Sequence, residues 1–431
     1  MKQLSLAIFS ILLATAGAFA QPRDSAKLLQ ESAALIQSGK FNDAEPLLRK
    51  ATTLTPENAD AHNLLGIVLD NLGKLAEAER EYRTAIRLNP KAVSPRANLG
   101  VLLARSNRPA EAVRTFEAVL RLRPDHPQTI VNLGFLYSAT GDFARAVEFL
   151  QKAARLQPND YEILLKLGTA LYQTQKLDDA KNVLTSAYLA DSTAADPVYF
   201  LGLIAFDQND FELAARYFDS VTTLKPDFAD AYFMIGEILA KQNRYADAIG
   251  FYEKAVALDK TKSVYFVRLG GTYLLNYEPV KSFQYFKEAA ERFPEIAEIK
   301  YFYAVAARST GEYDLAFKEA QKSLALKETA DVNALLGSMF FDRNDYPQAE
   351  KYLRRALALN PNHFNAQHDL GRILVKQQKF AEALPFLQRA AAQMPNIADI
   401  HYELFLIYTR LKRKAEADQE FALFKKLSNK K

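Results

Sequence analysis

The sequence predicts an all-α protein built from about twelve copies of one helix–turn–helix repeat of 34 residues. Three observations support this fold class. A Leu-Gly pair recurs at a fixed step, apolar residues follow one another at spacings of three and four, and a residue suited to positive φ separates the two apolar runs of each copy.

The fixed step defines where each repeat begins. Leu-Gly or Ile-Gly pairs recur at 34-residue steps, at Leu65-Gly66, Leu99-Gly100, Leu133-Gly134, Leu167-Gly168, Leu201-Gly202, Ile235-Gly236 and Leu269-Gly270. Later copies read Tyr303-Ala304, Leu336-Gly337, Leu370-Gly371 and Leu404-Phe405. The twelve repeats therefore start at residues 25, 59, 93, 127, 161, 195, 229, 263, 297, 330, 364 and 398. Because the ninth repeat is one residue short, we expect a local irregularity at residues 327–329.

Each repeat reads as two amphipathic helices joined by a tight turn. In the fourth repeat, Leu133 and Tyr137 share one helix face, and Ala146 and Leu150 share the next. The turn residues expected to take positive φ are Gly39, Gly73, Asn107, Gly141, Asn209, Asn243, Gly311 and Asn344. Prolines such as Pro56 are expected to stop the second helix.

The glycine of the Leu-Gly pair lies inside a helix, where it costs about 1 kcal/mol relative to Ala. A small residue, usually Ala, follows twelve positions later, as Ala146 follows Gly134. We interpret the pair as a close approach of the two helices, so Gly134→Leu is expected to clash.

These residues resemble the tetratricopeptide repeat family, whose pattern is met by Tyr232, Ile235, Gly236, Ala248 and Tyr252 of the seventh repeat. The resemblance covers residues 25–431. It implies a right-handed α-solenoid whose concave inner surface binds peptides or partner proteins. The family's usual Trp is absent, and the last repeat, with Phe405 at the glycine position, is expected to pack differently, as a terminal cap.

The N-terminal residues predict export. Lys2 precedes an apolar stretch from Leu4 to Leu13, and residues 18–20 read Ala-Phe-Ala, the small–x–small pattern of a signal peptidase site. We therefore expect a cleavable signal peptide at residues 1–20, a short leader at 21–24, the repeat array at 25–431, and a periplasmic or secreted location. An uncleaved membrane anchor is the alternative.

Composition and motifs argue against several function classes. The net charge of +4, from 55 basic and 51 acidic residues, does not favour nucleic-acid binding. There are no cysteines, and the five histidines form no His-Glu-x-x-His pair. His62 and His401 stand at the family's aromatic position, where packing is their expected role. The sequence thus predicts no enzyme, no cofactor and no metal site.

A second stripe of the first helices is expected to line the inner surface and to bind a partner. The residues predicted for this groove are Leu165, Tyr172, Tyr199, Leu203, Phe206, Phe233, Val267, Leu274 and Tyr301. Burial by tight curvature of the array is the competing interpretation. Asn98 and Asn132, equivalent in adjacent repeats, are candidates for contacts to peptide backbone by resemblance to the repeat domains of O-linked N-acetylglucosamine transferases.

The function expected from these features is a protein–protein interaction scaffold or adaptor in the cell envelope, with one or more proteins or peptides as partners. One alternative is a non-catalytic partner subunit of an envelope glycosyltransferase or polysaccharide-export system. Another is a self-assembling structural protein, a homodimer included, in which Leu423, Phe424 and Leu427 dock a second copy.

Overall fold

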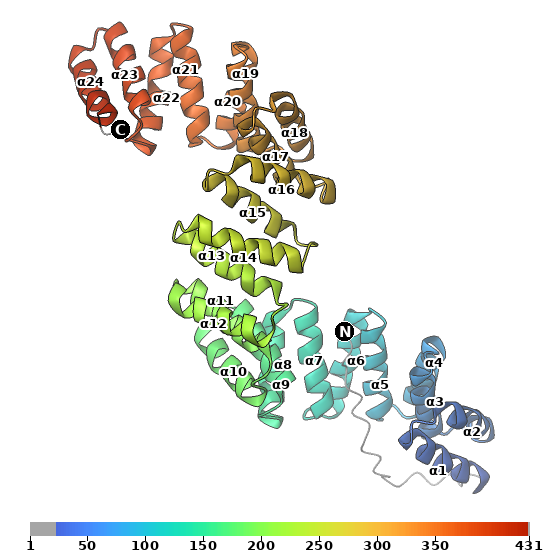
Figure 1. Ribbon diagram of the computed structural model, residues 1–431. Coiled ribbons are helices and arrows are strands. Elements are labelled where there is room, and N and C mark those ends of the chain that lie inside the picture. The colour runs from blue at the N-terminus through green and yellow to red at the C-terminus, as the bar shows by residue number, and fades with distance from the viewer. Residues whose placement is uncertain (1–22, 430–431) are drawn as a thin grey trace. The chain divides into compact units, whose positions relative to one another are not determined.

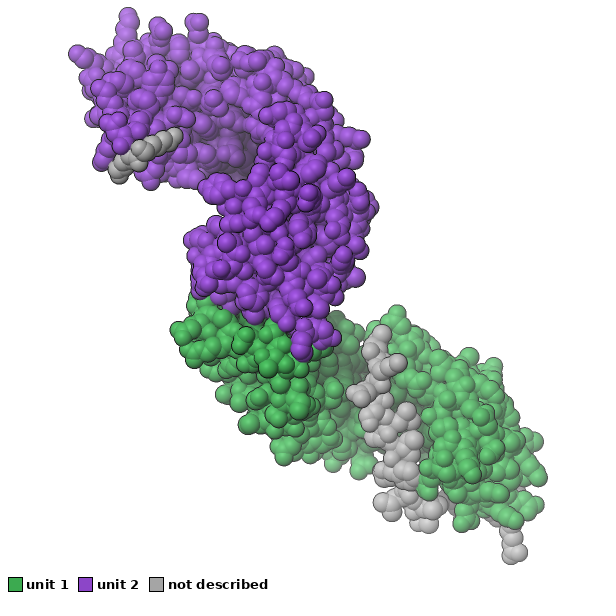
Figure 2. Space-filling view, in the orientation of Figure 1, with its two compact units in different colours: residues 1–225 green, residues 226–431 purple. Residues whose placement is uncertain are grey.

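The computed structural model describes residues 23–429 as twenty-four α-helices, and no strand occurs within that range (Figure 1). The all-α prediction is confirmed. The predicted signal peptide and residues 21–22 of the predicted leader lie outside the described residues. The chain divides into two compact units, residues 1–225 and 226–431, which Figure 2 colours separately.

Unit 1 contains the first six repeats. Its helices are α1 (Arg23–Gln37), α2 (Phe41–Leu54), α3 (Ala59–Asn71), α4 (Leu75–Leu88), α5 (Ser94–Arg105), α6 (Pro109–Leu122), α7 (Pro127–Ala139), α8 (Phe143–Leu156), α9 (Tyr161–Gln173), α10 (Leu177–Ala190), α11 (Ala195–Asp207) and α12 (Phe211–Leu224). The odd-numbered helix of each repeat packs against the even-numbered helix that follows it. The first helix begins at Arg23, two residues before the predicted start of the first repeat.

Unit 2 contains the remaining six repeats. Its helices are α13 (Ala229–Lys241), α14 (Tyr245–Leu258), α15 (Ser263–Leu275), α16 (Pro279–Arg292), α17 (Ala297–Ser309), α18 (Tyr313–Leu326), α19 (Ala330–Asp342), α20 (Tyr346–Leu359), α21 (Phe364–Lys376), α22 (Phe380–Gln393), α23 (Ala398–Arg410) and α24 (Lys414–Ser428). The same pairing of consecutive helices is followed here (Figure 1).

The turn inside each repeat has one residue at positive φ, as predicted. All eight residues expected there adopt it, for example Gly39 at 73° and Asn107 at 57°. Four more turns place a residue without the usual signal in this conformation, namely Gln175, Tyr277, Gln378 and Lys412. The turn geometry is therefore imposed by packing of the two helices where the local sequence does not favour it.

Eight of the eleven links between repeats contain the expected proline. The link after α2, residues 55–58, contains Pro56, and Asn58 caps α3 by accepting from the backbone N–H of Asp60 at 3.0 Å and of Ala61 at 3.2 Å. The link after α18 spans residues 327–329 alone, and Thr329 caps α19 through the N–H of Val332 at 3.2 Å. The predicted irregularity is confirmed as a shortened link.

The glycine of the Leu-Gly pair lies against the side chain sixteen residues later. A Cβ placed on Gly134 would lie 2.7 Å from Cδ2 of Leu150. The expected clash at this glycine is thus supported, but the added side chain would contact Leu150 rather than the small residue at position 146. The position twelve residues on does lie beside the glycine backbone, because Ser282 donates to the Gly270 carbonyl at 2.8 Å.

The fourth position of several repeats ties its helix to the preceding link. His62, Tyr232, Gln367 and His401 each place a side-chain polar atom 2.6–3.2 Å from the carbonyl oxygen of the proline six residues earlier. His62 and His401 are covered by the repeat stack, as the packing role expected for them requires. The family's aromatic position is therefore filled here by side chains that also satisfy a backbone carbonyl.

Candidate functional site

The residues predicted to line the groove form two groups, one in each unit. Five of them lie on α9 and α11 of unit 1: Leu165, Tyr172, Tyr199, Leu203 and Phe206. Four lie on α13, α15 and α17 of unit 2: Phe233, Val267, Leu274 and Tyr301. Val267 is buried, and the other eight are half-buried.

In unit 1, the aromatic side chains of this group contact one another and the core. Tyr172 donates from its hydroxyl to Asp207 at 2.8 Å, and its ring centroid lies 5.9 Å from that of Phe200. Tyr199 lies 5.7 Å, between ring centroids, from Phe218, which is fully buried. Each of these half-buried rings therefore packs with one part inside the chain, and its exposed part is the surface that a partner would contact.

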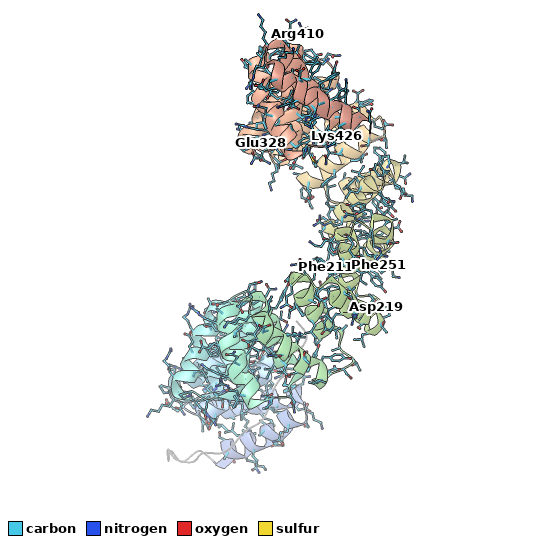
Figure 3. The ribbon with its side chains drawn as sticks, turned by 90° about the vertical axis from the view of Figure 1, so that its left-hand side faces the viewer. Phe211, Asp219, Phe251, Glu328, Arg410 and Lys426 are labelled. Atoms are coloured by element: carbon cyan, nitrogen blue, oxygen red, sulfur yellow. The ribbon has the colours of Figure 1, made fainter. Side chains whose placement is uncertain are left out.

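Phe206 closes this group at the end of α11. Its ring centroid lies 5.5 Å from that of Phe211, the first residue of α12, which Figure 3 labels. A role of these rings in binding stays a prediction.

In unit 2, the predicted residues are packed more tightly. The ring centroid of Phe233 lies 4.9 Å from that of Tyr265 and 5.6 Å from that of Tyr252, both buried. Burial raises the pKa of the Tyr301 hydroxyl to about 12, and the charge of Asp331 adds to this shift. The Tyr301 hydroxyl is therefore covered and neutral over the working range of pH.

The two asparagines have polar partners inside the chain. Asn98 donates from Nδ2 to Oδ1 of Asn63 in the preceding repeat at 3.1 Å. Asn132 is 5% exposed, and its Oδ1 accepts from Gln128 at 3.2 Å. A contact of these amides to peptide backbone stays a prediction, and it would require exchange of these hydrogen bonds.

A cavity of about 760 Å³ opens in unit 2 between α17 and α19. Val305, Leu335 and Met339 supply its apolar surface, and Leu335 and Met339 are themselves 8% and 4% exposed. Its remaining lining consists of Arg308, Ser309, Tyr313, Asp342 and Arg343. The size is that of a cleft able to take several side chains of a peptide.

Two ion pairs close the rim of this cavity. Arg308 contacts Asp342 at 2.6 Å and also donates to Ser338 at 3.0 Å. Arg343 contacts Asp314 at 2.9 Å, and the Asp314 side chain is fully exposed. Exposed pairs of this kind contribute roughly 0–1 kcal/mol, so an incoming charged segment can replace them at little cost.

The cavity lies between the ninth and tenth repeats, which the shortened link joins, but none of the link residues 327–329 lines it. In that link, Glu328 (labelled in Figure 3) accepts from Nε of Arg355 at 2.8 Å, which fixes the link to α20. Sequence analysis assigned none of the residues that line this cavity to a site, because the pattern shared by the repeats gives no signal for it.

Charged side chains of α21 and α23 contact one another. Glu403 contacts Arg372 at 3.2 Å and His368 at 3.4 Å. Burial raises the pKa of Asp369, and the charges of His368 and Arg372 oppose this rise. The arrangement can pair with charges of a partner.

Within residues 23–429, no cluster of three or more His, Asp or Glu side chains is arranged to hold a metal ion. None of the helices in the described part of the chain is long and apolar enough to cross a membrane.

Comparison with family models gives matches along most of the chain. Three models of the tetratricopeptide repeat match, the first at residues 29–93, 199–262 and 284–331, the second at 137–196 and 340–396, and the third at 91–159. Curated protein sequences give no match.

Solved structures of similar fold have low sequence identity to this chain. The complex titled APC/C hetero-tetramer Cut9–Hcn1 contains a chain that is 15% identical, with a TM-score of 0.49, and the match covers 95% of this chain and 94% of that one. The C-terminal part of a repeat protein from Cytophaga hutchinsonii is 21% identical, with a TM-score of 0.46 and coverages of 55% and 98%. PilF from Pseudomonas aeruginosa is 24% identical, with a TM-score of 0.40 and coverages of 47% and 92%.

The repeated helix pairs, the positive-φ turns and the glycine-to-side-chain contacts recur in both units, and the family models match both. The chain therefore belongs to the tetratricopeptide repeat family.

Proposed function

We propose that this protein is an interaction scaffold of the cell envelope that holds a segment of a partner protein in the cavity between α17 and α19. Repeats of this family typically form non-catalytic protein-binding scaffolds, and that general role is supported by the family matches. The observation that carries the specific proposal is the 760 Å³ cavity with its apolar surface and its charged rim.

The lining of this cavity suits an apolar anchor residue within a charged segment. Met339 is flexible and adapts to irregular side chains, and Val305 and Leu335 extend the same apolar surface. Arg308 and Arg343 can each exchange an exposed carboxylate for one from the partner. Tyr301, one of the residues predicted for the groove, lies one helical turn before Val305 on α17 and so on the same side of that helix as the cavity lining.

The cavity can be tested by site-specific photo-crosslinking in the native host. Tyr313 lines the cavity and is 58% exposed, whereas Tyr277 is 93% exposed and lies outside the lining. We expect a photo-reactive phenylalanine analogue to capture a defined partner when it replaces Tyr313, and to capture none when it replaces Tyr277. Capture of the same proteins from both positions would contradict the cavity as the binding site.

A captured partner can then be used to test the predicted groove. Binding of the purified partner is expected to weaken at least about tenfold for Met339→Lys, since a charge would enter the apolar surface. Affinity is also measured for Tyr199→Ala and Phe233→Ala, after circular dichroism has shown that both proteins are folded. This decides whether these residues of the predicted groove contribute to binding. Unchanged affinity for Met339→Lys would overturn the proposal.

The envelope location rests on the N-terminal sequence pattern. Fractionation followed by N-terminal sequencing tests it, because cleavage after Ala20 leaves Gln21 as the first residue. A chain that retains Met1 in the membrane fraction would support the anchored alternative. Recovery of a full-length chain from the cytoplasm would overturn export.

The two alternative functions predict different complexes. A partner subunit of a glycosyltransferase or polysaccharide-export system would be crosslinked to a catalytic or export protein from Tyr313. A self-assembling protein would sediment as a dimer or larger species. The terminal aromatic side chains favour packing within the chain, because Tyr402 and Phe424 have ring centroids 5.1 Å apart and Phe405 and Phe421 4.8 Å apart.

A further inference from the structure

A second cavity, of about 280 Å³, lies in unit 1 among α4, α5 and α6. Ile86, Leu99, Leu103 and Ala118 form its apolar surface. Arg83, Arg96, Arg114, Glu111 and Thr115 complete the lining. It lies in a different unit from the cavity between α17 and α19, and it is independent of the function proposed for that cavity.

The positive charge of this cavity is incompletely balanced. Glu111 is held by Arg108, which donates to its two carboxylate oxygens at 2.7 Å each, and Glu79 is shared by Arg83 and Arg108. Those hydrogen bonds lower the pKa of Glu111, and the charges of Arg114 and Arg83 lower it further. Three arginines and one glutamate line the cavity, and Arg108 and Glu79 beside it add one charge of each sign, so two positive charges of this group have no counter-ion within it.

Arg96 lacks the carboxylate that accompanies a basic side chain at the same position of other repeats. His62 and His401 each contact a glutamate nineteen residues later, Glu81 and Glu420, at 2.6 Å. Lys300 lies 4.0 Å from Glu319, again nineteen residues later.

The corresponding residue for Arg96 is Thr115, which lines the cavity and uses its hydroxyl to donate to the Glu111 carbonyl at 2.8 Å. The Arg96 guanidinium donates to the carbonyl of Ala92 at 2.6 Å, and burial without a carboxylate partner lowers its pKa.

We propose that this cavity binds a carboxylate with a short apolar body, the carboxylate meeting Arg96 and Arg114 and the body lying on Ile86, Leu99 and Leu103. The ligand's carboxylate then takes the place that a glutamate holds in the second, ninth and twelfth repeats. Both a free aliphatic acid and the C-terminal residue of a polypeptide have this chemistry. An arginine prefers such planar anions because its fork donates two parallel hydrogen bonds.

The first test measures binding of simple probes to the full chain at low ionic strength by saturation-transfer NMR. Hexanoate is expected to bind, while hexylamine, with the same body and the opposite charge, is not. Acetate and inorganic phosphate are expected to bind at least about tenfold more weakly than hexanoate, because they bury little apolar surface. Equal binding of acetate, phosphate and hexanoate would overturn the role of the apolar surface.

The two ligand sources are separated by a pentapeptide ending in Leu, prepared as the free acid and as the amide. If the free-acid peptide binds and the amide peptide does not, the site accepts chain termini as well as small acids. Binding of hexanoate without either peptide assigns it to small acids. Absence of binding by hexanoate and by both peptides would overturn the proposal.

Variants of the cavity test the named contacts. Thr115→Glu supplies the carboxylate found in the other repeats, and Arg96→Gln removes the charge, so each is expected to weaken hexanoate at least about tenfold. Arg96→Phe fills the cavity with the ring that Phe266 provides at the same position of the eighth repeat. All three proteins are checked for folding by circular dichroism.

Thr185 is an exposed residue of α10. Thr185→Glu makes the same charge change outside the cavity and is expected to leave hexanoate binding unchanged. Retention of binding by folded Thr115→Glu and Arg96→Phe would overturn the assignment of the site.

Discussion

Gly270 lies against the ring of Phe286, so closely that a Cβ at residue 270 would lie 2.6 Å from Cζ of the ring. The same relationship over sixteen residues recurs in nine repeats. At the same spacing, Ala304 is followed by the small Ala320, whereas in the last repeat Phe405 stacks on Phe421 with ring centroids 4.8 Å apart. In the nine repeats with glycine, the pair of positions is one packing unit, because the large side chain occupies the space that a Cβ would need.

Adjacent glycines on α15 provide a matched test of this contact. Gly270→Ala is expected to destabilise the eighth repeat by about 1–3 kcal/mol, because the added methyl group forces Phe286 to move. Gly271→Ala is expected to stabilise the same helix by about 1 kcal/mol, since open space surrounds its Cβ position and Ala has the higher helix propensity. Hydrogen exchange of α15 and α16 measures both effects locally, which suits a repeat array that need not unfold in two states.

A double variant checks the origin of the effect. Gly270→Ala should become close to neutral when Phe286 is also replaced by Ala, as at Ala304 and Ala320. Equal costs for Gly270→Ala in both backgrounds would show that the contact with Phe286 is not the cause.

The pair His62–Glu81 makes the stability of unit 1 depend on pH. The hydrogen bond that the His62 ring donates to Glu81 raises the pKa of His62 above about 6.5, the value in an unfolded chain, although burial opposes the rise. Folding therefore favours the protonated ring. Its stabilising contribution is complete below about pH 6.5 and is lost as the pH rises through the higher pKa of the folded state.

His62→Gln isolates this contribution. Gln367 shows that glutamine at the same repeat position donates to the proline carbonyl six residues earlier, at 2.6 Å. The stability advantage of the wild type over His62→Gln should therefore shrink as the pH is raised from 6 to 9, which denaturant titrations of the two proteins can measure. His126, whose pKa is lowered by burial, contributes equally to both proteins. An advantage that grows with pH would contradict the assignment.

Tyr277 adopts φ of 60° in the turn between α15 and α16 and is 93% exposed. Four equivalent turns use Asn at nearly the same φ, among them Asn243 at 58°. Because a left-handed residue other than Gly or Asn costs about 1–2 kcal/mol, Tyr277→Asn is expected to stabilise the turn by about 1 kcal/mol. The reciprocal Asn243→Tyr should destabilise its turn by a similar amount. A destabilising Tyr277→Asn or a stabilising Asn243→Tyr in thermal unfolding would contradict the argument.

Most of the fold follows from the sequence because the signal is repeated. One Leu-Gly pair is weak evidence, but the same pair at a constant step fixes the phase of every helix. The turns at Gln175 and Tyr277 could not be identified locally, since neither residue favours positive φ. The partner of each glycine was misplaced by one helical turn, because spacing alone does not reveal which side chain reaches the backbone.

The candidate sites were less predictable, because each arises from an exception to the pattern. The cavity between α17 and α19 has no counterpart in the shared pattern, and the cavity at Arg96 has Thr115 where three repeats with a basic fourth residue have glutamate. A repeat pattern identifies what neighbouring copies share. A site made by the absence of a counter-charge becomes visible when the copies are compared position by position in three dimensions.

The contribution of a carboxylate beside a basic residue at this repeat position can be tested in the ninth repeat, where both groups are present. Lys300 is 7% exposed and Glu319 is 4% exposed; the Lys300 Nζ donates to the Ala290 carbonyl at 2.8 Å and lies 4.0 Å from the Glu319 carboxylate. Glu319→Gln removes the charge from this buried pair, and we expect a loss of about 3–5 kcal/mol in the stability of α17 and α18.

Replacing both partners by Lys300→Phe and Glu319→Tyr imports the residues that the eighth repeat has at these positions, Phe266 and Tyr285. This double variant is expected to recover most of the loss, because well-packed apolar side chains can replace a buried ion pair without a net cost. Hydrogen exchange of α17 and α18 compares the three proteins. If Glu319→Gln costs less than about 1 kcal/mol, the pair is not what stabilises this repeat, and the absence of a carboxylate beside Arg96 would lose its significance as well.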